Sequence, residues 1–148
     1  MSTLASSKGL LLDTVVISEL RKGSRSEPAV AAWQLSVATV PAYLSVITLL
    51  EIRAGLRSVQ TRDPVFAARL DAWYREKLLP RFRDYLLPVD QSVAEAVAEL
   101  ATSRTLPPYD ALIAATARVH GLAVATRNVS DFADTGVEVI NPWAYAPD

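Results

Sequence analysis

Acidic residues stand after the short apolar runs of this sequence and at the start of a helical segment, where functional side chains are commonly placed. Three of them follow short apolar runs, at residues 9–12, 43–47 and 122–126, and a fourth opens the helical segment before the last run. The four acids are Asp13, Glu51, Asp110 and Asp131. Carboxylates gathered at one place repel one another, so a bound cation is the economical explanation for such a set, and hard oxygen ligands select Mg²⁺ or Mn²⁺. The acids therefore predict a metal site that can activate water and stabilise in-line displacement at phosphorus, which suits phosphodiester hydrolysis.

The rest of the sequence lacks the residues of competing chemistries. The chain has no cysteine, so it has neither disulfides nor a thiolate zinc site, and its one histidine, His120, excludes a histidine-rich metal cluster. There is no GxxxxGK phosphate loop, and Asp13-Thr14-Val15 lacks the second aspartate of a phosphoaspartyl hydrolase. Any metal must therefore be held by oxygen ligands.

Each acid also has a simpler explanation, because all four lie where a carboxylate stabilises the start of a helix. The segment from Thr48 to Glu51 matches a capping box by its residue types. Taken singly, each acid is explained as a helix cap, and this alternative stays open. Taken together, the four favour the metal site.

The elements that must position these acids alternate between strand and helix. Apolar runs predict strands at residues 9–12, 43–47, 122–126 and 137–140, and the brief apolar stretch at residues 85–89 lies third in this series of five. Helical spacing and caps predict helices from Thr14, from Pro28 after Ser26, from Thr48, from Asp63 to near Leu79 where Pro80 ends it, after Asp90, and over residues 109–119 before Gly121. This alternation predicts an α/β fold with a mostly parallel, short-stranded sheet and helices on both faces. The acids then meet at the carboxyl edge of the sheet, where open α/β sheets bind ligands.

The composition fits a single compact domain over residues 1–148 that is 51% hydrophobic and carries a formal net charge of -1. No apolar run approaches the roughly 20 residues that a membrane-spanning helix needs. Residues 1–8 do not resemble a secretory leader. We therefore expect a cytoplasmic protein without a membrane partner. The net charge decides nothing about nucleic acid, because a local basic patch suffices for that.

Several blocks of the sequence resemble, in order and spacing, the VapC and FitB-like PIN domains of toxin–antitoxin pairs. The blocks are Leu11-Leu12-Asp13-Thr14 with residues 16–20, Leu44 to Ile52, Asp110-Ala111-Leu112-Ile113-Ala114-Ala115-Thr116-Ala117, His120-Gly121-Leu122, Ala125-Thr126-Arg127-Asn128-Val129-Ser130-Asp131-Phe132, and residues 136–143. Any one block would be weak, but their combination over nearly the whole chain makes chance resemblance improbable.

The resemblance implies a three-layer α/β/α fold and an endoribonuclease toxin that uses Mg²⁺ or Mn²⁺ to cleave RNA. It further implies a VapB-like antitoxin that blocks the site, and a homodimer. Asp13, Glu51, Asp110 and Asp131 fall on the family's four acids, as catalytic residues and metal ligands. Thr14 and Asn128 fall on accompanying polar positions.

The chain departs from this family at Val15, where asparagine is common and its amide helps to order the acids. If the amide matters, its absence weakens metal affinity or activity by about 10- to 100-fold. If Val15 instead packs beneath the first helix, burial of an amide there costs stability and gains nothing. The two interpretations predict opposite outcomes for Val15→Asn.

Basic residues near the acids are candidates for RNA contacts. Arg21, Lys22 and Arg25 follow the first strand and helix, and Arg53 and Arg57 lie four residues apart beyond Glu51. These side chains could hold RNA phosphates, and ordinary solvated surface is the alternative.

Two other functions remain open on the sequence. One is a binding module that keeps the fold and an antitoxin or RNA surface but has lost turnover, as Val15 permits. The other is a metal-dependent phosphoesterase acting on DNA or a small phosphate ester, because the acids alone do not distinguish a ribose from a deoxyribose or another alcohol. A metal-dependent RNA cleavage assay separates the three.

Overall fold

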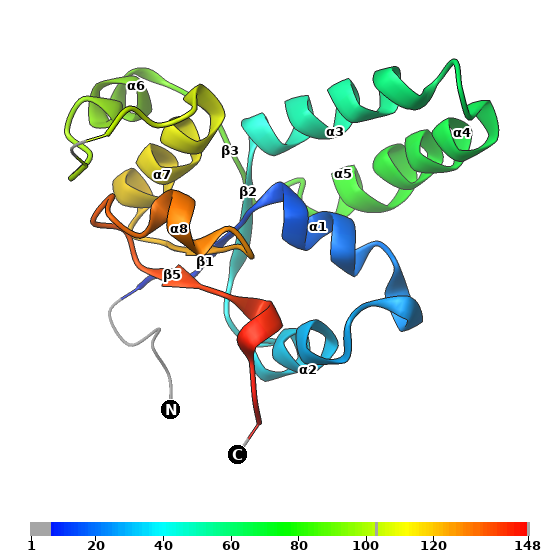
Figure 1. The fold of residues 1–148 in the computed structure, drawn as a ribbon, viewed down its shortest axis with the longest axis horizontal. Coiled ribbons are helices and arrows are strands. Elements are labelled where there is room, and N and C mark those ends of the chain that lie inside the picture. The colour runs from blue at the N-terminus through cyan, green and yellow to red at the C-terminus, as the bar shows by residue number, and fades with distance from the viewer. Residues whose placement is uncertain (1–6, 103, 148) are drawn as a thin grey trace.

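The computed structural model describes residues 7–102 and 104–147, which form a sheet covered by helices on both faces (Figure 1). The sheet has five strands in the order β3-β2-β1-β4-β5, and each neighbouring pair is parallel. The strands are β1 (Leu10–Leu12), β2 (Ala42–Ser45), β3 (Leu86–Leu87), β4 (Ala123–Ala125) and β5 (Val139–Ile140). The predicted parallel, short-stranded sheet is confirmed, with β1 at its centre.

Alternate residues of the central strands send their side chains to opposite faces, as strand geometry requires. Leu10 and Leu12 pack with residues of α1 (Thr14–Leu20), α2 (Pro28–Ser36) and part of α3 (Val46–Val59). Leu11 packs on the other face with residues of α7 (Pro108–His120) and α8 (Val129–Phe132). The protein therefore has two apolar layers, one on each side of the sheet, and the predicted α/β/α arrangement is confirmed.

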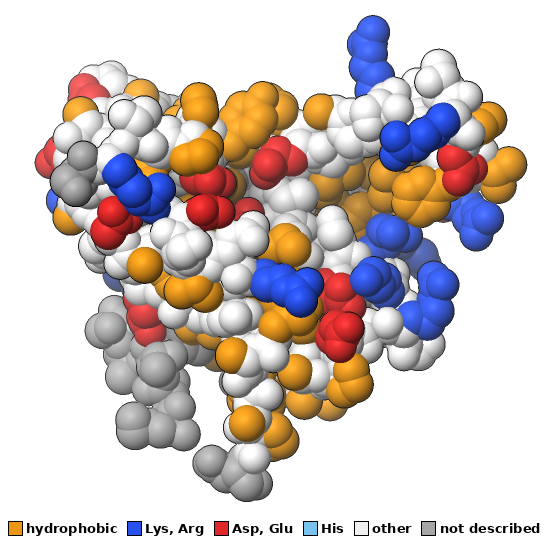
Figure 2. Space-filling view, viewed as in Figure 1, with side chains coloured by type: hydrophobic (Ala, Val, Ile, Leu, Met, Phe, Trp, Pro, Cys, Tyr) orange, Lys and Arg blue, Asp and Glu red, His pale blue; other side chains and the backbone are white. Residues whose placement is uncertain are grey.

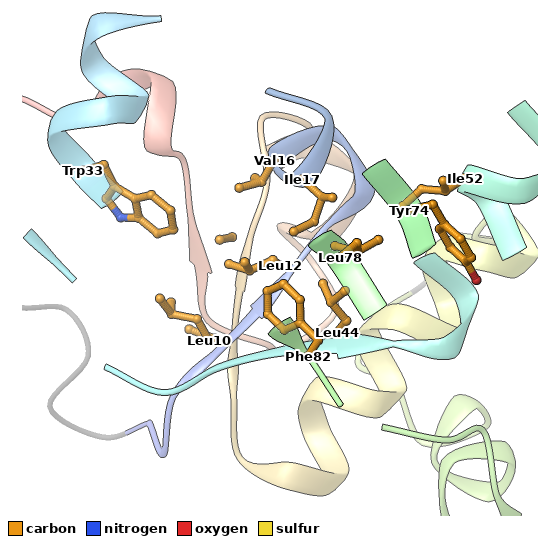
Figure 3. Packing of buried hydrophobic residues seen from close by; sticks show 12 residues of the cluster. Leu10, Leu12, Val16, Ile17, Trp33, Leu44, Ile52, Tyr74, Leu78 and Phe82 are labelled. Carbon is orange, nitrogen blue, oxygen red and sulfur yellow. The ribbon is translucent and has the colours of Figure 1, made fainter. Parts of the chain in front are cut away.

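The larger apolar layer is drawn in Figure 3. Trp33 points from α2 toward the sheet, and Phe82 lies beside Leu12 and Leu44. All of these side chains are almost fully buried. Because both faces of β1 are packed in this way, the position of its carboxyl end is fixed by the core.

The third helix begins earlier than the sequence predicted. Residues 46 and 47 are apolar and were predicted to extend the second strand, but α3 starts at Val46 and its N-cap is Ser45, whose hydroxyl accepts from Ile47 N at 3.0 Å. The predicted capping box from Thr48 to Glu51 is therefore wrong. The buried side chain of Ser45 caps the helix and so sets its first residue. The Glu51 side chain is therefore not needed as part of a cap.

The prediction that Pro80 ends the long helix is also wrong. The helix α4 (Pro64–Trp73) runs into a π-helical turn, η2 (Tyr74–Leu78), and continues through α5 (Leu79–Arg81), which contains Pro80. Leu79 N donates to Tyr74 O, five residues back. Proline has no N–H and its ring clashes with the carbonyl four residues earlier, and the wider π turn relieves both constraints.

The helices α6 and α7 lie near their predicted places. α6 (Gln91–Val97) is capped by Asp90, which accepts from Val93 N at 3.0 Å, and α7 ends at Gly121 with a φ of 68°. Short 3₁₀ turns, η1 (Gly23–Arg25) and η3 (Pro142–Ala144), complete the described elements. Within residues 7–102 and 104–147, no helix combines the length and apolar character needed to cross a bilayer.

Candidate active site at the carboxyl edge of the sheet

Asp13 joins the end of β1 to the start of α1, and the fold holds its carboxylate in place. Its Oδ1 accepts from Thr14 N at 2.9 Å, and its Oδ2 accepts from Thr126 Oγ1 at 2.7 Å. Its backbone N donates to Ala125 O at 2.9 Å, which extends the pairing of β1 with β4 by one residue. Asp13 therefore caps α1, as the simpler explanation predicted, with one carboxylate oxygen. Its other carboxylate oxygen is held by Thr126, the residue that follows β4.

Thr126 is a site residue that sequence reasoning assigned only to a strand. Its side chain is fully buried, and its Oγ1 also accepts from Asn128 N at 3.0 Å. The register that pairs Leu12 with Ala125 sets Asp13 opposite Thr126 at the next position. Thr126 could have been identified from the sequence only if the pairing of β1 with β4 had been known, because this pairing places the residue after β4 opposite Asp13.

Glu51 reaches the same region from the second turn of α3. Thr14 Oγ1 donates to Glu51 Oε1 at 2.6 Å, and the Thr48 hydroxyl lies 3.2 Å from Thr14 Oγ1. A threonine hydroxyl has one proton and can also accept, so Thr48 is placed to donate to Thr14. Thr14, predicted as a supporting residue, thus links the helices that carry Asp13 and Glu51.

Asp110 and Asp131 lie in the first turns of α7 and α8, which cover the other face of the sheet. Neither helix has a side-chain cap at its N-terminus, so neither acid is used as the cap that the simpler explanation required. In the space-filling view, acidic side chains gather between the region of α7 and α8 and that of α1 and α3 (Figure 2). The helix α8 itself was not predicted from the sequence.

The four acids lie close enough for their charges to interact. Burial raises the pKa of Asp13, and the charge of Asp131 raises it further, although two hydrogen bonds act in the opposite direction. Burial likewise raises the pKa of Glu51, with a contribution from Asp13. The pKa of Asp110 is raised by burial and then by the charges of Asp131, Asp13 and Glu51, while Arg104 opposes them. The structure therefore brings the four predicted residues into one electrostatic neighbourhood.

These pKa directions predict how stability depends on pH when no metal is present. Asp13, Glu51 and Asp110 bind protons more tightly in the folded chain, so their stabilising contribution is complete below pH about 4 and is lost as pH rises through their raised values. In EDTA, the unfolding free energy should fall over this range, and it should fall less in Asp110→Asn. Chemical unfolding at a series of pH values measures this. Identical pH profiles for the two proteins would contradict the electrostatic account.

The four carboxylates are suitable ligands for a hard divalent cation, but they do not form a complete coordination shell in this structure. Among the described residues, no three Asp, Glu, His or Cys side chains stand in an arrangement that would ligate one ion directly. Mg²⁺ does not require such a cage, because it usually keeps several waters and binds through one or two carboxylates plus a substrate phosphate. A cation would also relieve the mutual repulsion that raises the pKa of Asp110.

Arg104 is a second residue that the sequence did not reveal, and it holds α8 in place. Its Nη2 donates to Ser130 O at 3.1 Å and to Asp131 O at 2.7 Å, and its Nε and Nη2 also contact the Asp134 carboxylate at 3.0–3.2 Å. Burial and neighbouring acids raise the pKa of Asp110, and the positive charge of the same guanidinium opposes that rise. Arg104 therefore positions the backbone that carries Asp131 and places positive charge near the acids. Its loop carries no motif that marks it.

Asn128 was predicted as a supporting polar residue. Its backbone N–H donates to Thr126, whereas its exposed side chain forms no cap on α8. The described contact with the site is therefore made by the main chain, and a role for the amide stays a prediction.

Val15 is partly buried and packs against the apolar layer that contains Leu12 and Val16. This contact favours the packing interpretation. We expect Val15→Asn to lower the free energy of unfolding by about 1 kcal/mol, because an apolar contact is replaced by a partly desolvated amide, and not to increase cleavage. Chemical unfolding and RNA cleavage measure the two effects.

Val65→Asn is the matched control, because Val65 lies in α4 and is 64% exposed. It should change stability much less than Val15→Asn. A gain in cleavage by Val15→Asn at unchanged stability would instead show that the missing amide limits cleavage.

The predicted basic residues separate into two places. Arg21, Lys22 and Arg25 line a pocket of about 480 Å³ together with Phe66 and Arg69 of α4. The pocket is not part of the acidic cluster but lies beyond the far end of α1, the helix that Asp13 caps.

Arg53 and Arg57 instead line a groove of about 860 Å³ between α3 and α4. Arg53 Nη1 pairs with Asp71 Oδ1 at 2.6 Å and its guanidinium lies 5.3 Å from the Tyr74 ring centroid. Arg53 is therefore already neutralised by an acid, and it is a poorer candidate for phosphate than the arginines of the first pocket.

The fold and the acidic edge correspond to a known class of domain. The PIN domain family matches residues 10–138, so this chain belongs to the PIN domain family.

Within that family, relatives match over almost their whole length. The VapC ribonuclease Y4jK of Sinorhizobium fredii is 39% identical over 140 residues, which cover 93% of this chain and 99% of the relative. Toxin FitB of Neisseria gonorrhoeae is 36% identical over 141 residues, covering 90% of this chain and 98% of FitB. The crystal structure of FitAcB from Neisseria gonorrhoeae superposes with a TM-score of 0.78 at 34% identity, covering 91% of this chain and 99% of that chain.

Proposed function

We propose that this protein is a metal-dependent endoribonuclease and the toxin of a toxin–antitoxin pair, with residues 1–148 forming a single PIN-like nuclease domain. The observation that carries the proposal is the set of four carboxylates at the carboxyl edge of the sheet, whose charges act on one another. Relatives that share more than a third of the sequence are named as a VapC ribonuclease and as toxin FitB, which supports the same activity.

In this proposal Asp13, Glu51, Asp110 and Asp131 hold Mg²⁺, or Mn²⁺ in its place. The ion supplies positive charge that activates water and stabilises charge on the phosphate under attack. Thr126 and Thr14 hold the Asp13 and Glu51 carboxylates in fixed directions through short hydrogen bonds. A carboxylate that does not bind the ion directly can accept a hydrogen bond from the attacking water and orient it toward phosphorus.

We base the proposed partners and location on the resemblance to these relatives. We propose an RNA substrate, a VapB-like antitoxin that covers the acidic edge, a homodimer and a cytoplasmic location. The antitoxin is supported by the likeness to VapBC-5 from Mycobacterium tuberculosis, a member of the VapBC family of toxin–antitoxin systems whose structure superposes with a TM-score of 0.60 at 28% identity.

The test is cleavage of a single-stranded RNA in Mg²⁺, in Mn²⁺ and in EDTA, with a DNA oligonucleotide of the same sequence beside it. We expect endonucleolytic cleavage of RNA with either metal and none in EDTA. We also expect Mg²⁺ to raise the melting temperature of the wild-type protein, and to raise that of Asp110→Asn less, which reports metal binding independently of activity. Cleavage of DNA alone would favour the phosphoesterase alternative, and metal binding without cleavage would favour a binding module.

A further inference from the structure

We propose that the basic pocket of Arg21, Lys22, Arg25, Phe66 and Arg69 binds backbone phosphates of single-stranded RNA beside the cleavage site. The inference rests on the proposed function, since it names where the substrate of the acidic edge is held. Four of the five lining residues are cationic and none is acidic. The pocket combines residues of two segments, 21–25 and 66–69, that the sequence does not join.

Most of the cationic side chains of this pocket form no ion pair with an acid among the described residues. Among the described residues, Lys22 alone of the four forms an ion pair, with Glu19 at 3.0 Å. The exposed side chains of Arg25 and Arg69 form no ion pair or hydrogen bond in the part of the chain that the structure describes. This contrasts with the groove between α3 and α4, where Asp71 pairs with both Arg53 and Arg75. An anion entering the basic pocket displaces few existing contacts.

Phe66 lines the pocket and contacts one of its arginines. The guanidinium of Arg21 lies 5.4 Å from the Phe66 ring centroid, in the range of a cation–π contact. The donors of a guanidinium lie in its own plane, so an arginine that stacks on a ring still presents its N–H groups to a phosphate. The contact therefore orders one phosphate ligand before RNA binds.

The position of the pocket suits a strand that crosses the acidic edge. Asp13 caps the start of α1 and Arg21 follows its end, and the seven residues of this helix span about 10 Å. In Figure 2, basic side chains gather where the end of α1 and η1 face α4, on the same side of the molecule as the acidic side chains. The acids repel a polyanion, and the whole chain has a net charge of -1, so attraction for RNA must come from a local basic surface.

The experiment measures binding without cleavage. A fluorescent single-stranded RNA of mixed sequence is titrated with the wild-type protein in EDTA, over a series of salt concentrations, and fluorescence anisotropy gives the Kd. The pocket variant is Arg25→Gln with Arg69→Gln. The control variant is Arg83→Gln with Arg118→Gln, which removes the same charge from two exposed arginines outside the pocket. Melting temperatures establish that both variants are folded.

We expect the pocket variant to bind RNA about 10-fold more weakly, and its plot of log K against log salt to become shallower by about 1.4, because each phosphate contact to a single strand contributes about 0.7. The control should retain the wild-type affinity and slope within about 3-fold. Equal losses in the two variants, no loss in the pocket variant, or no binding by the wild type would overturn the proposal.

A second probe separates RNA from an acidic protein segment. An oligoglutamate peptide is titrated in the same way, and loss of peptide binding with unchanged RNA binding would overturn the proposal in favour of a protein partner. Because these measurements exclude metal, they are independent of cleavage. RNA binding lost in the pocket variant of a protein that never cleaves RNA would support the pocket and refute the proposed function.

Discussion

Asp110→Asn and Asp13→Asn are each expected to lower metal-dependent RNA cleavage by about 100-fold or more. Replacement of a residue that merely orients a metal ligand typically costs about 10- to 100-fold, and a direct ligand should cost at least the upper end of that range. Asparagine keeps nearly the same volume, so the loss reports charge rather than packing. Initial cleavage rates at saturating and limiting Mg²⁺ measure the effect.

Asp110→Asn should not weaken the fold. Burial and neighbouring acids raise the pKa of Asp110 in the folded chain, so its charged carboxylate is a cost to folding at neutral pH and the neutral amide removes that cost. In EDTA at pH 7, Asp110→Asn should therefore melt at the wild-type temperature or above it. Asp84→Asn, at an exposed acid outside the cluster, is the control and should cleave normally. Undiminished cleavage by Asp110→Asn would remove this residue from the site.

Thr126→Val should lower cleavage by about 10- to 100-fold, because it removes the hydroxyl that holds Asp13 Oδ2. Valine has a similar shape, but it leaves a buried carboxylate oxygen and Asn128 N without their partner, at a cost of about 1–3 kcal/mol in stability. The lost hydrogen bond also lowered the pKa of Asp13, so this pKa rises further in the variant. Activity that needs the carboxylate should then appear at higher pH than in the wild type.

Two controls distinguish positioning from general destabilisation. Thr126→Ser keeps the hydroxyl and should recover most of the cleavage. Thr116→Val removes another fully buried threonine hydroxyl, one that donates to Leu112 O within α7, and should lower stability without moving the pH profile. If Thr116→Val and Thr126→Val lose cleavage equally, Thr126 has no special connection to the site.

The acids could be located from the sequence because β1 and β4 are short apolar runs that end at polar residues. In a parallel sheet such ends share one edge, so Asp13 and Asp131 could be placed together without knowledge of any side chain. Glu51 was placed correctly near that edge for a partly wrong reason. The helix that carries it begins at Val46, and the Thr48 hydroxyl contacts Thr14 instead of capping the helix.

The residues that hold the acids were harder to predict, because their roles depend on contacts between distant segments. Arg104 acts through carbonyl groups of α8, and carbonyl groups carry no sequence signal. Thr126 acts through the register of two strands that are separated by most of the chain. The π turn before Pro80 was missed because proline in a helical pattern ordinarily marks an end.

The hydrogen bond from Thr126 to Asp13 joins residues 113 positions apart in the chain. A ribosome makes the N-terminal part first, so during synthesis Asp13 emerges long before the strand that completes its surroundings. Until β4 has been inserted beside β1, the growing polypeptide lacks Thr126, Asp131 and α8. Under the proposed function, the nascent chain therefore cannot cleave the RNA around it until almost all of its own message has been translated.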